Sequence, residues 1–252
     1  MGHGLMLRYN QKQFGVRRQT LERLEKLYDE SYFQNRFGEG TAEYKRDVEK
    51  REKMYQLELE RVKTYVKNFS SGGNALDIGC GRGEFLALLG DNWQKYGIEV
   101  SDHARTIAEK NGVITDFEPQ DNFFDLIIFR GTIQHIPDPV YKISECFYWL
   151  KKGGAIIFLA TPNIHSIVYR LFKNLPMIEE KLNFLLPSDK VLRQILTNFG
   201  FQDIKFEYPY FKTPYARPVY DLVSFLLRLI GIKNKLNFAF YGNMLECYAR
   251  KP

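Results

Sequence analysis

The chain has 252 residues, of which 44% are hydrophobic and 26% are charged, a composition typical of a folded protein. This length allows one domain with a sizeable core plus an appendage, and no apolar run approaches the ~20 residues that span a bilayer. The net charge of +6 is uneven, because basic residues outnumber acidic ones in 1–70 and 205–252 but not in 71–204. Such basic ends suit an anionic acceptor, a membrane surface or RNA, or they form an ordinary solvated surface.

The cysteines Cys80, Cys146 and Cys247 are odd in number and lack the spacing of a metal site. They favour a reduced, cytoplasmic location. The first residues include no secretory apolar region, and Met6 stands where a myristoylation signal needs Ser or Thr. Because no His, Cys and Asp cluster with ligand spacing occurs, we expect a reaction that needs no metal ion.

Residues 1–70 are predicted to form a helical segment separate from the core in 71–252. In 41–69, apolar residues recur at spacings of three, four and seven, which indicates an amphipathic helix. The Ser-Ser-Gly-Gly stretch at 70–73 then ends that helix. Before it lies an aromatic and polar stretch at 28–38, which ends in glycine.

The rest of the chain is organised around the stretch from Asn74 to Phe85. A short apolar run contains Asp77 near its end, and glycines follow at alternate positions 79, 81 and 83. This pattern predicts a strand, a tight turn and a helix, in which bare backbone lets a ligand approach closely. Residues 96–100 read as a second strand that places Glu99 at its end, where a carboxylate can accept the ribose hydroxyls of a nucleoside.

Together these features resemble motif I and the second strand of the class I S-adenosylmethionine (SAM) dependent methyltransferases. Further strands are predicted at 113–115, 123–129, 155–160, 201–208 and 242–251. Alternation with helices implies an α/β, Rossmann-like, seven-stranded and mostly parallel sheet with an antiparallel last strand and an N-terminal helical lid. Longer inserts are expected at 164–186 and 209–241.

Two loop phrases narrow the resemblance. His-Ile-Pro-Asp-Pro at 135–139 and Thr-Pro-Asn at 161–163 are similar to the group that includes quinone-biosynthesis and sugar O-methyltransferases. That group commonly has glutamate before the histidine, whereas this chain has Gln134. Any family role that needs a carboxylate at this position is therefore not assigned to this chain. The resemblance implies SAM contacts from Asp77, Gly79, Cys80, Gly81, Glu99, Val100, Asp116, Phe117 and Arg130.

On the acceptor side, the resemblance places Tyr32 and Arg36 in a lid over the cofactor. We also expect Tyr215 and Arg217 of the 209–241 connection to contact a small acceptor, with Arg217 meeting an anionic group. The same connection has two competing interpretations, a homodimer surface or a peripheral membrane contact. In either, Leu222, Phe225, Leu226 and Leu229 would face outward.

A hydroxyl acceptor must lose a proton, and His135 and His165 each follow a predicted strand, where sites occur in open α/β sheets. We expect His135 before His165 as the base, although both residues also suit simple loop hydrogen bonds. The favoured function is O-methylation of a sugar, nucleotide-sugar or glycan hydroxyl. Alternatives are another metabolite, such as a quinone, lipid or natural product, or a non-catalytic SAM-binding protein.

Two further classes are disfavoured. Amino-methylating nucleic-acid enzymes of this fold carry Asp/Asn-Pro-Pro-aromatic after the fourth strand, where this chain has Arg-Gly-Thr-Ile at 130–133. The glycine spacing and the two loop phrases also count against a dinucleotide-dependent dehydrogenase.

Overall fold

The computed structural model describes residues 42–252 except 176–177, 179–182, 185, 233 and 235–239. The predicted lid stretch at 28–38, with Tyr32 and Arg36, therefore lies outside the described residues. The strands are β1 (Gly73–Ile78), β2 (Trp93–Ile98), β3 (Phe124–Arg130), β4 (Leu150–Pro162), β5 (Gln202–Glu207) and β6 (Met244–Arg250). The α-helices are α4 (Ala42–Tyr65), α5 (Glu84–Ala87), α6 (Asp102–Lys110), α7 (Pro139–Trp149), α8 (Ile167–Phe172), α9 (Asp189–Asn198) and α10 (Pro218–Leu229). Short 3-10 helices are η1 (Phe69–Ser71) and η2 (Ile133–His135).

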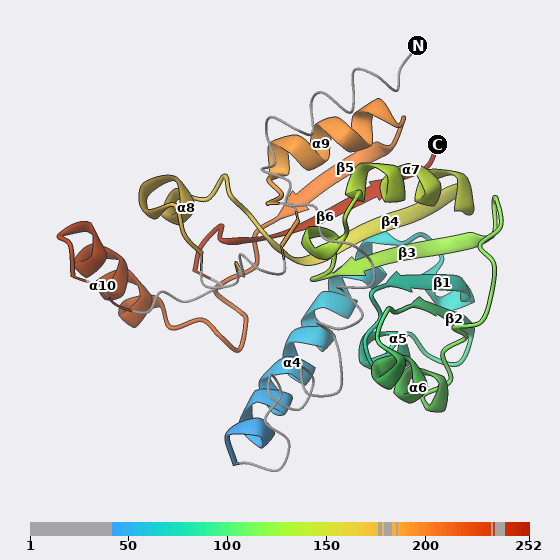
Figure 1. Ribbon diagram of the computed structural model, residues 1–252, viewed down its shortest axis with the longest axis horizontal. Helices are drawn as coiled ribbons and strands as arrows, with labels where there is room; N and C mark the ends of the chain where they lie inside the picture. The colour runs from blue at the N-terminus through green and yellow to red at the C-terminus, as the bar shows by residue number, and fades with distance from the viewer. Residues whose placement is uncertain (1–41, 176–177, 179–182, 185, 233, 235–239) are drawn as a thin grey trace.

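One sheet of six strands, in the order β2-β1-β3-β4-β6-β5, forms the middle of the molecule (Figure 1). β1 pairs in parallel with β2 and β3, and β3 with β4, whereas β6 is antiparallel to both β4 and β5. The α/β class, the mostly parallel sheet and the antiparallel last strand are thus confirmed. Because the first four strands are parallel, their carboxyl ends meet at one edge.

The predicted count of seven strands is wrong. The run at 113–115 forms only an isolated parallel bridge between Ile114 and Tyr96. Two backbone hydrogen bonds hold it, from Gly97 N–H to the Ile114 carbonyl (3.0 Å) and from Ile114 N–H to the Lys95 carbonyl (2.8 Å). The chain then bends at Asp116, so the pairing stops after one residue.

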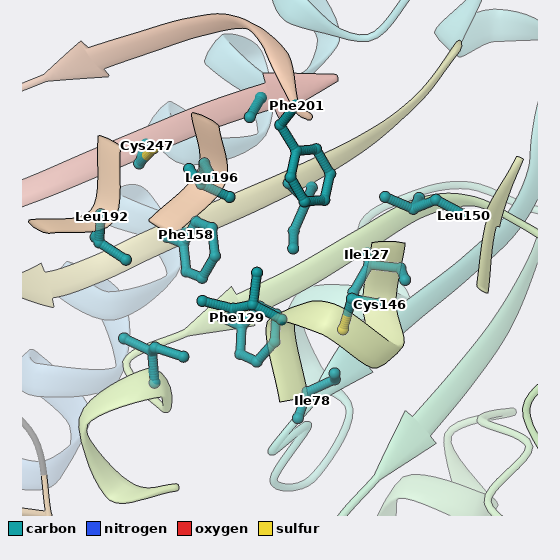
Figure 2. Close-up of a cluster of buried hydrophobic side chains, with 14 of the residues drawn as sticks. Ile78, Ile127, Phe129, Cys146, Leu150, Phe158, Leu192, Leu196, Phe201 and Cys247 are labelled. Atoms are coloured by element: carbon teal, nitrogen blue, oxygen red, sulfur yellow. The ribbon is translucent and has the colours of Figure 1, made fainter. Parts of the chain in front are cut away.

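Helices cover both faces of the sheet. On one face, the side chains of β3 and β4 pack against α7 and α9, and Figure 2 shows Phe129 and Phe158 of that core beside Leu192 and Leu196. These two phenylalanine rings stack with centroids 5.0 Å apart. On the other face, α4 and α5 pack against Leu126, Ile128 and Ile157.

The amphipathic helix predicted at 41–69 appears as α4, and its apolar stripe lies directly on the sheet. Leu59 and Val62 are 2% and 0% exposed. Side-chain capping defines the start of α6, where the Ser101 side chain accepts a hydrogen bond from Ala104 N–H. Pro139 likewise opens α7.

The 209–241 connection carries its own helix, α10, as connections of this length often do. Figure 1 shows α8 and α10 together at the end of the molecule away from α5 and α6. The α10 helix has 12 residues. Within the described part of the chain, no helix combines the length and the apolar character needed to cross a membrane.

Candidate active site

The glycine turn after β1 adopts the backbone conformation that its spacing predicted. Gly79, Gly81 and Gly83 have φ values of 78°, 55° and 75°, in the left-handed region that favours glycine. A Cβ on Gly79 would lie 2.3 Å from Cγ2 of Thr132, whereas a Cβ on Gly81 would meet nothing within 4 Å. Gly79 therefore serves close packing, and Gly81 leaves open space beside its backbone.

Glu99 lies just after β2 and reaches across to this turn. Its Oε2 accepts a hydrogen bond from Gly81 N–H (2.9 Å), and its Oε1 accepts one from Ser101 N–H (2.9 Å). Burial raises the pKa of Glu99, and the backbone hydrogen bonds oppose that rise. Each carboxylate oxygen keeps a second lone pair for a ligand hydroxyl.

Asp77 near the end of β1 is a buried carboxylate, 2% exposed. Its Oδ1 has no hydrogen-bond partner among the described residues. Burial raises its pKa to about 7, while the nearby Arg130 lowers it and Glu99 and Glu58 raise it further. A ligand that brings a donor or a positive charge to Oδ1 would satisfy this group.

The remaining residues predicted to contact the cofactor differ in exposure. Cys80 is buried at 7% exposure, Val100 is half-buried and Asp116 is exposed. The half-buried Phe117 ring packs edge-on to Tyr96, with centroids 5.1 Å apart. The orphaned Asp77 oxygen, the open space at Gly81 and the carboxylate of Glu99 together fit a nucleoside with a cationic group.

Arg130 at the end of β3 has a partner that sequence reasoning missed. Its Nε lies 2.6 Å from Oε2 of Glu58, which is 0% exposed and belongs to α4. Its guanidinium also lies 4.0 Å from the ring centroid of Tyr55. An acidic residue within the apolar stripe of the predicted helix was the signal for this pair, because a buried charge needs a partner.

The two candidate histidines have different surroundings. His135 ends η2, and its Nε2 lies 3.2 Å from Nε2 of Gln134. His165 follows β4, and its Nδ1 lies 2.9 Å from Oδ1 of Asp189, the first residue of α9. Tyr208 donates its hydroxyl to the other oxygen of Asp189 at 2.5 Å. The sequence did not reveal this His–Asp–Tyr contact, because its members come from three segments that lie apart in the chain.

The two acceptor residues predicted in the 209–241 connection have different surroundings. Tyr215 lines a cavity of about 200 Å³ together with Arg130, Glu58 and Glu246. Arg217 instead precedes α10, is exposed, and stacks at 4.4 Å over the ring of Tyr220.

A second group of charges joins α4 to β6 beside this cavity. Arg61 forms two hydrogen bonds to Glu246 at 2.6 Å and 2.5 Å, and Tyr248 donates to the same carboxylate at 2.5 Å. Burial raises the pKa of Glu246, and Arg61 opposes that rise. Among the residues that the structure describes, no group of three or more His, Cys, Asp or Glu side chains could hold a metal ion.

A model of a family described as a methyltransferase domain matches residues 48–205, which include the glycine turn, Glu99 and both loop phrases. The chain belongs to this methyltransferase family. It is a class I SAM-dependent methyltransferase, and SAM is its cofactor.

Named relatives of the methyltransferase act on different acceptors. It is 27% identical to a phosphoethanolamine N-methyltransferase of Triticum aestivum, over 58% of this chain and 32% of that enzyme. It is 25% identical to a malonyl-[acyl-carrier protein] O-methyltransferase of a Paenibacillus species, over 73% of this chain and 75% of that enzyme. The chain thus spans about a third of the first relative and three quarters of the second.

A solved structure supports the fold. The SAM-dependent methyltransferase of Thermotoga maritima, described as a possible histamine N-methyltransferase, superposes with a TM-score of 0.59 at 24% identity. The match covers 83% of the methyltransferase and 95% of the Thermotoga chain.

Proposed function

We propose that the methyltransferase transfers the methyl group of SAM to a hydroxyl of a small acceptor, with a sugar, nucleotide-sugar or glycan as the favoured class. The contact between His165 and Asp189 carries this proposal. A hydroxyl is a poor nucleophile until a base removes its proton, and a histidine oriented by a carboxylate suits that task. We therefore favour His165 over His135 as the base.

The surroundings of Asp189 keep its carboxylate charged. Burial alone would raise its pKa, but hydrogen bonds from Tyr208, from Lys190 N–H and from His165 outweigh burial, and the pKa is lowered. With the ring proton on Nδ1 facing Asp189, Nε2 of His165 is free of that proton and can accept one from the acceptor. Asp189 would also stabilise the charged imidazole formed in the reaction.

We assign cofactor contacts from the geometry around the glycine turn. Glu99 would accept the ribose hydroxyls, Gly79, Cys80 and Gly81 would lie against the nucleoside, and Asp77 would face the ammonium group of the methionine part. The adenine would lie beside Val100, Asp116 and Phe117. SAM supplies the activated methyl group, and the protein supplies position and the base.

Tyr215 stays a proposed acceptor contact through the cavity that it shares with Arg130, and because His165 does not line this cavity, the reacting hydroxyl would extend beyond it toward His165. Tyr32 and Arg36 stay proposed lid contacts, whereas Arg217 lies outside the lining of this cavity. The three cysteines are free and buried, which supports our assignment of the enzyme to the reducing cytoplasm. An amine acceptor is the second candidate, because the Triticum relative is a phosphoethanolamine N-methyltransferase.

Transfer of a labelled methyl group from SAM separates these candidates. The panel should contain nucleotide-sugars and glycans as hydroxyl acceptors, and phosphoethanolamine and histamine as amines. We expect label in a hydroxyl acceptor, and a fall in kcat of about 100-fold or more for His165→Ala, with the affinity for SAM retained. Asp189→Asn should reduce kcat less strongly.

The matched control is His103→Ala on α6, which should leave kcat unchanged. His135→Ala tests the other histidine in the same assay. Labelling of amines alone, or full activity of His165→Ala, would overturn the proposal.

A further inference from the structure

Helix α10 turns its polar side toward the interior of the protein. Asp221 and Ser224 are 1% and 4% exposed and face the protein. Asp221 accepts hydrogen bonds from the Tyr210 hydroxyl (2.5 Å) and from Arg217 N–H (3.1 Å). The Ser224 carbonyl accepts a hydrogen bond from the Asn234 side chain (2.8 Å). A surface helix of a soluble protein normally has the opposite orientation.

The outward side of α10 is apolar along its whole length. Its residues recur three or four positions apart, so they form one stripe, and each is about half exposed or more: Val219 (79%), Leu222 (52%), Val223 (49%), Leu226 (51%), Leu229 (49%) and Ile230 (74%). Phe225 does not belong to this stripe. Its ring packs against Phe172 and Phe240, with centroids 5.9 Å and 5.7 Å away, which corrects the expectation that it faces outward.

Helix α8 adds to the same apolar region. Ile167 and Leu171 are 53% and 52% exposed. Helix α8 lies beside α10 (Figure 1), and the rings of Phe172 and Phe225 make contact between the two helices. At the base of α10, the exposed rings of Phe211 (70%) and Tyr241 (60%) lie with centroids 6.5 Å apart. Aromatic rings of this kind favour the boundary between membrane and water.

The charge around this apolar face is positive. The sequence of 209–241 has Asp221 as its one acidic residue, and that side chain is buried against Tyr210. The described basic residues of the two helices and their flanks are Arg170, Lys173, Lys212, Arg217 and Arg228, the last of which stacks on Phe172.

We propose that the α8–α10 face, defined by the exposed apolar residues of these two helices, docks onto the surface of an anionic membrane. An apolar helix face with basic flanks lies in the headgroup region of a bilayer, where the apolar residues leave water and the cations meet anionic lipids. A second copy of the chain is the less suitable occupant, because its face would bring the same positive charge. This inference does not depend on the acceptor proposed above.

Vesicle flotation tests the inference with the full chain. The parent should bind vesicles that contain phosphatidylglycerol more tightly than vesicles of phosphatidylcholine alone, and added salt should weaken that binding. The double variant Leu222→Ser/Leu226→Ser should partition about tenfold less, because two half-exposed leucines no longer leave water. Lys212→Gln/Arg217→Gln should reduce binding to the anionic vesicles only.

The matched control is Tyr141→Ser/Tyr148→Ser, which removes two exposed side chains (60% and 61%) from α7. It should bind as the parent does, and circular dichroism should show that all variants are folded. Absence of binding by the parent, or equal binding by Leu222→Ser/Leu226→Ser, would overturn the inference. A dimer in light scattering that this double variant converts to a monomer would assign the face to a second copy instead.

Discussion

The two halves of the sheet's carboxyl edge are built by different means. At β1 and β2, the glycine turn and Glu99 are joined through backbone N–H groups, between residues 18 apart in the sequence. At β3 and β6, side-chain pairs connect the edge to α4. Glu58 and Arg130 are 72 residues apart, and Arg61 and Glu246 are 185 residues apart.

This difference implies that substitutions in the two halves have different effects, on cofactor binding in the first and on folding stability in the second. The turn owes its shape to local backbone conformations, so a change there should alter cofactor affinity or local strain. Glu58 and Glu246 are almost fully buried, 0% and 1% exposed, so removal of one partner of a pair leaves the other charge in the protein without its hydrogen-bonded counterion. The following predictions test this separation, from the largest expected effect to the smallest.

Glu58→Ala should lower the free energy of unfolding by about 3–5 kcal/mol, because Arg130 keeps its charge in a buried place without its partner. Urea unfolding followed by circular dichroism measures the change. The control is Glu60→Ala on the same helix, whose partner Lys63 lies 2.9 Å away at the exposed surface. That substitution should change the free energy by less than about 1 kcal/mol. Equal effects of the two substitutions would contradict a structural role for the buried pair.

Asp77 should make the protein without cofactor less stable as the pH rises. Its carboxyl keeps its proton up to about pH 7 when folded, against an ordinary value of 3.8. The stabilisation is therefore complete below the ordinary pKa and is lost as the pH rises through about 7, by up to about 4 kcal/mol. Urea unfolding across this range should show a steeper decline in the parent than in Asp77→Asn, which keeps the raised pKa values of Glu99 and Glu246. A parallel decline in both proteins would rule out Asp77 as its source.

Gly79→Ala and Gly81→Ala should distinguish two roles of the glycine turn. The first glycine serves close packing, and the second leaves space for a ligand. The first should lower the free energy of unfolding by about 2–4 kcal/mol, because a Cβ would collide with Thr132 in a left-handed backbone. The second should cost about 1–2 kcal/mol for its backbone alone and should mainly weaken SAM binding. Calorimetry and thermal unfolding of both variants provide the measurements. A Gly81→Ala protein that binds SAM as the parent does would show that the open space is not used.

Glu99→Ala should weaken SAM binding by about 1–3 kcal/mol, because the ribose hydroxyls would lose their acceptor. Isothermal titration calorimetry gives the affinity, with Glu109→Ala on the exposed side of α6 as the control. Unchanged affinity for SAM in Glu99→Ala would refute the assignment of this residue.

Local sequence was sufficient for the backbone of the glycine turn and its neighbouring elements. The alternate glycines require left-handed backbone, Ser101 supplies a helix cap, and a buried apolar run becomes a parallel strand, each through neighbours in the chain. The same reasoning predicted a full strand at 113–115, where the structure has only a single bridge. Its residues suit a strand, but only the tertiary structure decides how many of them reach the edge of β2.

The other half depended on the tertiary structure. Periodicity predicted the apolar stripe of α4, and the sequence offered outward leucines in the 209–241 connection as one alternative, but neither pattern states whether a protein core or the surroundings will cover such residues. In α4 the stripe lies on the sheet and brings Glu58 into contact with Arg130. In α10 the stripe faces outward and Asp221 is buried. The pairing of His165 with Asp189 likewise joins the end of β4 to the start of α9. Such contacts between distant residues are set by packing of the whole sheet, so the sequence determined the fold and cofactor, and the tertiary structure decided which charged side chains meet.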